Sequence, residues 1–229
     1  MGEAMRVAVL VSAYDCAATI EAVVSGARGH LDDVLVVDDG SRDQTAARAR
    51  AAGAEVLQFA ANRGKGAALQ AGMTALAQRG VTHTLTMDGD GQHLAREVPT
   101  LLAAAAADPQ ALIIGARRIG TQEVQAVKLF GNRFANRWVE IASGLALPDS
   151  QSGLRVYPLA ATLRLGASAE RFAFETEVLI RAARAGMAIH SVPVDVYYPP
   201  AAERISHYAP WRDTVRIIGV VLGLIFRVR

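Results

Sequence analysis

The sequence predicts an α/β fold with a mainly parallel central sheet and helices on both faces. Short apolar runs of strand length alternate with Ala-rich segments of helical length, which is the pattern of an open, mainly parallel sheet. The runs at residues 6–12 and 33–37 are almost continuously apolar, as expected of strands buried on both faces. Polar, Gly-containing clusters follow several runs, at the position where ligands bind in such sheets. The 229 residues are enough for one large domain.

Each predicted strand is a short run in which β-branched or other apolar residues dominate. Residues 6–12 (RVAVLVS) set the pattern, and residues 33–37 (DVLVV) and 82–87 (THTLTM) repeat it. In chain order, we expect strands at residues 6–12, 33–37, 55–59, 82–87, 111–115 and 188–196.

The predicted helices fill the intervals between these strands. In chain order, we expect them at residues 19–28, 45–52, 65–79, 97–107, 128–143, 175–185 and 214–229. The second half is less regular, with a polar stretch at 149–155 and a Pro-punctuated loop at 197–212. We therefore expect one domain over residues 1–213 and an apolar, Arg-flanked terminal helix over 214–229.

The composition excludes several classes of protein. The apolar share of 52% includes 44 alanines, and the apolar run 217–226 is too short for a membrane span, which needs about 20 residues. One cysteine, Cys16, excludes a disulfide scaffold or a Cys-rich zinc module. A net charge of +2 argues against a nucleic-acid partner. Residues 5–13 fit a signal peptide poorly, so a reducing, cytoplasmic location is expected.

Two carboxylates directly after a predicted strand form the strongest local motif. Asp88 and Asp90 stand at i and i+2, with Gly89 and Gly91 permitting a tight backbone and Gln92 following. Hard oxygen ligands of this kind suit Mg²⁺ or Mn²⁺, which one or two carboxylates hold together with substrate phosphates. The alternative is a turn that is simply rich in Asp and Gly.

Two further polar clusters lie after strands or before a helix. Asp38 and Asp39 end the strand at 33–37, where a carboxylate can accept hydrogen bonds from a nucleobase or ribose, or can shape a turn before a helix. The stretch 62–66 (NRGKG) precedes a helix and favours anions. It is no Walker A loop, because Gly66 stands where Ser or Thr is required.

Taken together, the motifs occur in a characteristic order and spacing. They are SAYD at 12–15, VVDDGS at 36–41, NRGKG at 62–66, MDGDGQH at 87–93, GAR at 115–117, DSQSGLR at 149–155, FETE at 174–177 and ISHYAPWRD at 205–213. Over residues 6–213 the chain resembles family 2 glycosyltransferases of GT-A fold. It is most similar to the branch that holds dolichyl-phosphate mannosyltransferase and the bacterial polyprenyl-phosphate glycosyltransferases.

The resemblance implies a site for a nucleotide-diphosphate sugar, carrying UDP or GDP. The residues that match positions contacting the nucleotide are Ser12, Tyr14, Asp39, Lys65 and Asp88. The residues that match metal ligands are Asp88, Asp90 and Gln92. At one corner the chain departs from the family, because Asp15 stands where Asn is usual.

The resemblance also implies an inverting transfer and a lipid-phosphate acceptor. Arg117 and Arg204 match basic residues near the diphosphate and the acceptor, and Lys128 and Asn132 fall in the acceptor region. Such an acceptor is already anionic and needs no strong base. A hydroxyl acceptor needs one, and Asp149, then Glu175, are the expected candidates.

Three alternatives remain open at this level. A haloacid-dehalogenase-like phosphatase also uses an acidic pair after a strand, although there the pair lies on the first strand. A catalytically inactive nucleotide-sugar binder is the second. The third concerns the terminal helix, which either packs on the domain or lies in a membrane interface at the inner face of the cytoplasmic membrane. Residues 201–229 hold five arginines and two acidic residues.

Overall fold

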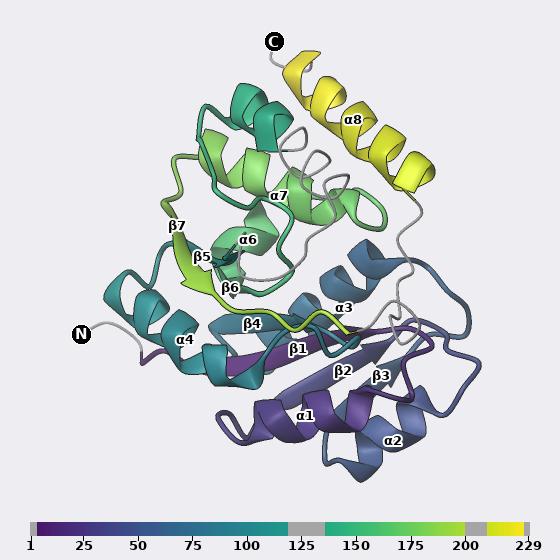
Figure 1. Cartoon of the computed structure of the whole chain (residues 1–229). Helices are drawn as coiled ribbons and strands as arrows, with labels where there is room; N and C mark the ends of the chain where they lie inside the picture. Colours follow the sequence, from purple (N-terminus) through teal and green to yellow (C-terminus); the bar gives the residue numbers. More distant parts are fainter. Residues whose placement is uncertain (1–3, 119–135, 200–209, 227–229) are drawn as a thin grey trace.

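A seven-stranded sheet lies at the centre of the computed structural model, which describes residues 4–118, 136–199 and 210–226 (Figure 1). The strand order is β3-β2-β1-β4-β6-β5-β7. The strands are β1 (Val7–Ala13), β2 (Val34–Asp38), β3 (Glu55–Gln58), β4 (His83–Asp88), β5 (Leu112–Arg117), β6 (Arg155–Pro158) and β7 (Ile189–Val194). The predicted mixed α/β architecture is confirmed.

One strand, β6, runs against its neighbours. It is antiparallel to β4 and to β5, whereas the other adjacent pairs are parallel. The sequence does not predict β6, because its four residues are RVYP and begin with an arginine. Arg155 is nevertheless fully buried. Its guanidinium donates hydrogen bonds to the carbonyl oxygens of Ser150, Ser152 and Glu175, so the buried charge is solvated by the backbone.

Helices cover both faces of the sheet, as predicted. One face carries α1 (Ile20–Arg28), α2 (Thr45–Ala51), the 3₁₀ helix η1 (Ala95–Glu97) and α4 (Val98–Ala107). The other carries α3 (Lys65–Gln78), α6 (Leu159–Arg164) and α7 (Ala173–Arg184). Because successive side chains of a strand point to opposite faces, Val9 and Val11 of β1 pack in the first core and Ala8 and Leu10 in the second.

The terminal helix α8 (Pro210–Phe226) packs beside α7 (Figure 1). It begins four residues before the predicted start, inside the stretch expected to be a loop. Ile217 and Val221 are buried against Ile180 of α7 and Ala142. Within the ranges that the structure describes, no helix is both long and apolar enough to cross a membrane. Of the helix expected over 128–143, residues 136–143 are described and are helical.

The carboxyl ends of the central parallel strands meet at one edge of the sheet. Ser12 of β1 is in register with Asp88 of β4, and Ala13 of β1 is in register with Asp38 of β2. The polar clusters that follow these strands are therefore neighbours in space, although they lie up to 76 residues apart in the sequence.

Candidate active site

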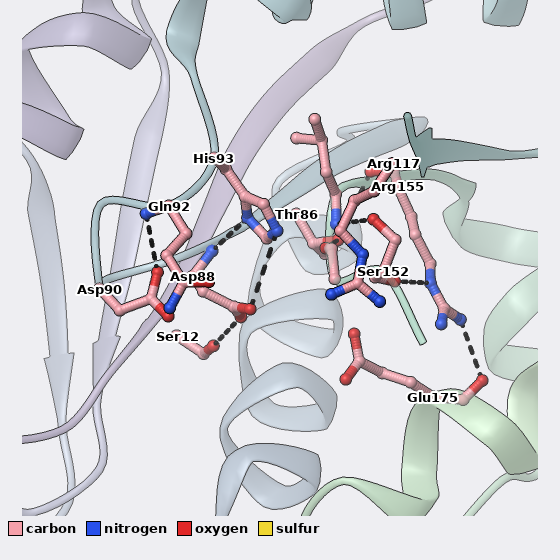
Figure 2. A network of polar contacts seen from close by, with 12 residues as sticks. Ser12, Thr86, Asp88, Asp90, Gln92, His93, Arg117, Ser152, Arg155 and Glu175 are labelled. Carbon is pink, nitrogen blue, oxygen red and sulfur yellow. Dashed lines mark hydrogen bonds and ion pairs between the residues drawn. The ribbon is translucent and has the colours of Figure 1, made fainter. Parts of the chain in front are cut away.

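The acidic loop, residues 88–93, begins at the last residue of β4. The Asp88 carboxylate accepts a hydrogen bond from the Ser12 hydroxyl (3.4 Å), and the Gly89 amide donates to the Ser12 carbonyl (3.0 Å). Asp90 Oδ1 accepts the Gln92 amide at 2.9 Å (Figure 2). Gly91 adopts a left-handed φ of +76°, which glycine reaches without steric cost. The sequence-predicted metal ligands thus follow one another in one tight loop.

A buried ammonium group joins this loop to two helices. Lys65, the first residue of α3, places Nζ 2.6 Å from Asp88 Oδ1 and 2.9 Å from Glu175 Oε2 of α7. Burial opposes the charge of Lys65, but attraction to Asp88 and Glu175 outweighs it and raises the pKa of this amine. Burial likewise opposes the charge of Asp88, and the neighbouring Lys65 ammonium lowers the pKa of that carboxyl overall.

Among the residues that the structure describes, Asp90, the second carboxylate of the loop, forms no ion pair comparable to that of Asp88 with Lys65. Burial, and then repulsion from Asp88, raise the pKa of Asp90 to about 6. Two carboxylates and an amide side chain in one loop are hard oxygen donors, and the repulsion between the acids is what a bound cation relieves. In the part of the chain that the structure describes, no three His, Cys, Asp or Glu residues form a metal cluster. The two carboxylates and the amide side chain are a donor set that suits Mg²⁺ or Mn²⁺.

A histidine closes the acidic loop and was not assigned a role from the sequence. His93 Nδ1 accepts the backbone N–H of Asp88 at 3.0 Å, and Nε2 lies 4.0 Å from Asp88 Oδ2 (Figure 2). Burial lowers the pKa of His93 to about 4, despite the nearby Asp88 charge. The imidazole is consequently neutral at physiological pH. Its position one residue after Gln92 was the available signal.

Asp38, the last residue of β2, and Asp39, which follows it, hold the backbone around the nucleotide corner predicted from the sequence. Asp39 accepts the amide N–H groups of Arg63 (2.6 Å) and Gly64 (2.7 Å), which fixes the turn before α3. Burial raises the pKa of Asp39, against these hydrogen bonds. Asp38 instead accepts hydrogen bonds from the amide and hydroxyl of Ser41. The cationic loop 62–66 thus lies against the end of β2.

A bidentate ion pair lies at the end of β5. Arg117 Nε and Nη2 donate to the two carboxylate oxygens of Asp149 at 2.6 and 2.9 Å, and the Arg117 amide donates at 3.2 Å. Asp149 is 1% exposed. Burial opposes its charge, but the Arg117 guanidinium lowers the pKa of Asp149 overall. Asp149 therefore fixes the orientation of Arg117.

Gly153 is a second residue that the sequence alone did not single out. A Cβ at this position would lie 2.7 Å from Asp88 Oδ2 and 2.8 Å from Lys65 Nζ. Only a glycine lets the chain entering β6 approach the ion pair so closely. The available signal is the glycine in the GLR part of the DSQSGLR motif. In the sequence alone, however, this glycine is indistinguishable from an ordinary loop residue.

The remaining predicted residues lie beside the acidic loop, near the nucleotide corner, or outside the described ranges. Ser12 is a residue of β1 and lies near the acidic loop. Tyr14 follows that strand and is half-buried. Asp15, the departure from the family, has a positive φ and accepts the Arg42 amide at 2.7 Å. Three predicted residues lie outside the described ranges: Arg204, Lys128 and Asn132.

Comparison with known proteins identifies similar sequences over most of the chain. The model of glycosyl transferase family 2 matches residues 8–149. The undecaprenyl-phosphate mannosyltransferase of Micrococcus luteus is 32% identical over 207 residues, which cover 83% of each chain. The UDP-N-acetylglucosamine–dolichyl-phosphate N-acetylglucosaminyltransferase of Methanococcus voltae is 25% identical over 233 residues, 92% of this chain and 90% of that protein.

Solved structures show the same fold. Glucosyl-3-phosphoglycerate synthase of Mycobacterium tuberculosis, solved with Mn²⁺, UDP and phosphoglyceric acid, superposes with a TM-score of 0.74 at 23% identity. The match covers 96% of this chain and 78% of that one. This likeness confirms the predicted GT-A fold.

Proposed function

Since the chain belongs to glycosyltransferase family 2, whose model matches residues 8–149, we propose that it transfers a sugar from a nucleotide-diphosphate sugar to a lipid phosphate. The observation that carries the proposal is the meeting of acids and cations at one sheet edge: Asp88 and Asp90 lie in one loop, and Lys65 touches the first of them. Relatives of similar length are named for polyprenyl-phosphate and dolichyl-phosphate acceptors.

The donor is expected to bind between the ends of β1 and β2 and the start of α3. Ser12, Tyr14 and Asp39 are the proposed contacts of the base and ribose, and Lys65 and Asp88 those of the diphosphate side. The N-terminus of α3 adds backbone N–H groups and a positive dipole end, which favour an anion there. Either UDP or GDP suits this chemistry.

A divalent cation is proposed to assist departure of the nucleoside diphosphate. Asp88, Asp90 and Gln92 are the residues that would hold Mg²⁺ or Mn²⁺. When bound, the ion supplies positive charge that stabilises the leaving diphosphate. Lys65 shares this region and already balances Asp88.

The acceptor is proposed to attack the anomeric carbon from the opposite face, so that the configuration inverts. Asp149 remains the first candidate base for a hydroxyl acceptor, and Glu175 the second. However, both oxygens of Asp149 are engaged by Arg117, and its pKa is lowered, which makes it a weak base. A phosphate acceptor carries its own negative charge and requires only positioning, for which we propose Arg117 and Arg204.

The lipid acceptor implies work at a membrane surface, and we propose that α8 contributes to this contact. Arg216 of this helix is half exposed, and its one described ion pair, with Glu170, is long at 3.8 Å. The arginine-rich segment 201–229 favours anionic headgroups. The expected location is the inner face of the cytoplasmic membrane.

The proposal is tested by a screen of UDP- and GDP-sugars with Mn²⁺ against a polyprenyl phosphate and a diacyl lipid. Transfer to the polyprenyl phosphate, with release of nucleoside diphosphate, is the expected result. Hydrolysis of p-nitrophenyl phosphate without nucleoside diphosphate would favour the phosphatase alternative. Binding of a nucleotide sugar with no transfer to either lipid would favour an inactive binding protein.

A further inference from the structure

The acidic loop contains two glycines within its first four residues, so its backbone requires external anchors. Gly89 and Gly91 lose more conformational entropy on ordering than other residues. One anchor comes from the segment after β7. The Tyr197 amide donates to the Gln92 carbonyl at 2.9 Å, and Val196 forms an antiparallel bridge with His93.

The second anchor is the His93 side chain, which turns back onto the start of the loop. Its Nδ1 accepts the Asp88 N–H at 3.0 Å. Because a nitrogen that accepts a hydrogen bond carries no proton, the ring proton of the neutral imidazole lies on Nε2. That Nε2 lies 4.0 Å from Asp88 Oδ2, beyond direct hydrogen-bond distance. The contact that fixes the loop is thus the one at Nδ1.

We propose that His93 is a positioning residue that fixes the acidic loop through the Asp88 amide and so tightens its hold on a divalent cation. The inference rests on the proposed function, in which Asp88 and Asp90 hold that cation. His93 takes no part as a ligand. Its role is to close the backbone from Asp88 to His93 into a ring, so that the two carboxylates are presented from a preformed loop.

Because Nδ1 is the acceptor, only a substitution of His93 that keeps an acceptor at the position of Nδ1 should preserve the hydrogen bond. Asparagine places Oδ1 one bond beyond Cγ, as histidine places Nδ1, and it retains an acceptor for the Asp88 N–H. Glutamine extends to the reach of Nε2, and leucine offers no acceptor. His93→Asn is therefore the rescuing variant, while His93→Gln and His93→Leu lose the contact. His30→Leu, at an exposed position, is the matched control for loss of a histidine.

The first measurement is binding of Mn²⁺ alone to the full chain, followed by the EPR signal of free Mn²⁺. We expect His93→Leu and His93→Gln to raise the Kd about tenfold, the usual cost of losing a group that supports metal ligands. His93→Asn should stay within about threefold of the wild type on the same scale. Equal affinity in wild type and His93→Leu would overturn the proposal, and rescue by Gln rather than Asn would overturn the Nδ1 assignment.

The second measurement is hydrogen exchange of the Asp88 amide without metal. Exchange should be slow in wild type and His93→Asn, and about tenfold or more faster in His93→Leu, because a lost hydrogen bond of about 1.4 kcal/mol corresponds to tenfold. Equal exchange in all variants would overturn the anchoring role. If wild type binds no Mn²⁺, the metal part of the proposed function fails and the cation-tightening inference fails with it, while exchange still decides whether His93 anchors the loop.

Discussion

Lys65 Nζ lies 2.6 Å from Asp88 Oδ1, and this contact joins the start of α3 to the end of β4. The same ammonium lies 2.9 Å from Glu175 Oε2 on α7. One cation therefore balances two buried or half-buried carboxylates from elements distant in sequence. Lys65 and these two carboxylates set the charge balance of the site in the absence of substrate.

Replacing Lys65 by methionine should destabilise the fold, because two carboxylates lose their cation. Breaking a buried pair costs about 3–5 kcal/mol; Asp88 is 27% exposed, so we expect about 2 kcal/mol in the free energy of unfolding, measured with urea. Lys65→Arg keeps the charge and serves as the control. The double variant Lys65→Met/Glu175→Gln should regain part of the loss. A single variant as stable as the wild type would contradict the balancing role.

Asp90→Asn should lower the turnover of the enzyme without lowering the stability of the fold. Burial and then repulsion from Asp88 raise the pKa of this carboxyl, and Asp90→Asn removes both penalties on the charge, so the thermal midpoint should hold or rise. Mn²⁺-dependent release of nucleoside diphosphate from the sugar donor should fall at least about a hundredfold, since a bound ion contributes several kcal/mol at a leaving group. The control is Asp32→Asn, at an exposed position. Normal turnover in Asp90→Asn would refute the proposed ligand role.

Much of the sheet could be predicted because β1 and β2 are nearly continuous apolar runs and β4 is rich in β-branched threonine. For this reason the predicted ends of β1, β2 and β4 each lie within one residue of the observed ends. The short helix α6, in contrast, was not predicted. β6 was missed because Arg155, a residue that usually marks the surface, is buried there among backbone carbonyls. Local pattern does not reveal that a distant carbonyl, such as that of Glu175, will solvate the charge.

Motif order located the candidate site, but the partners of its residues depended on tertiary structure. Asp149 was expected as a base, and its pairing with Arg117 involves a residue 32 positions away. The contact of Lys65 with Glu175 likewise spans two helices. Sequence spacing carries no information about which acid meets which cation across such distances.

The Arg117–Asp149 pair predicts a pH dependence of stability. The folded pKa of Asp149 lies below its unfolded value near 3.9, so the pair stabilises the fold above that value and the contribution is lost as pH falls through the folded pKa. Urea unfolding of wild type and Asp149→Asn should differ most above about pH 5, and the difference should shrink as the pH falls through the lowered pKa of the folded state. The double variant with Arg117→Met supplies the coupling energy. A difference that stays constant over this range would contradict the pairing.

We expect that the two roles of α8, packing against α7 and binding to an anionic membrane surface, can be tested with separate variants. Deletion after Asp213 removes Ile217 and Val221 from α7 and should lower the thermal midpoint. Binding to anionic vesicles is tested instead with a variant that leaves those apolar contacts in place. It combines Arg212→Gln, Arg216→Gln, Arg227→Gln and Arg229→Gln. Since each basic residue near an anionic surface contributes about 1 kcal/mol, we expect at least about a tenfold weaker partition at an unchanged midpoint. Unchanged partition would assign α8 to packing alone.

Alanine at position 153 should disturb the site while leaving the fold. Its Cβ would lie within 2.8 Å of both Asp88 Oδ2 and Lys65 Nζ, so at least one of these side chains must shift, and we expect the geometry of the ion pair to be disturbed. Sugar-transfer turnover should fall about tenfold or more, the loss expected when a supported ligand is misplaced. The matched control is Gly219→Ala in α8, where a Cβ meets nothing within 4 Å and helix propensity favours alanine by up to about 1 kcal/mol. Full activity in Gly153→Ala would show that the Lys65–Asp88 contact is not needed for turnover.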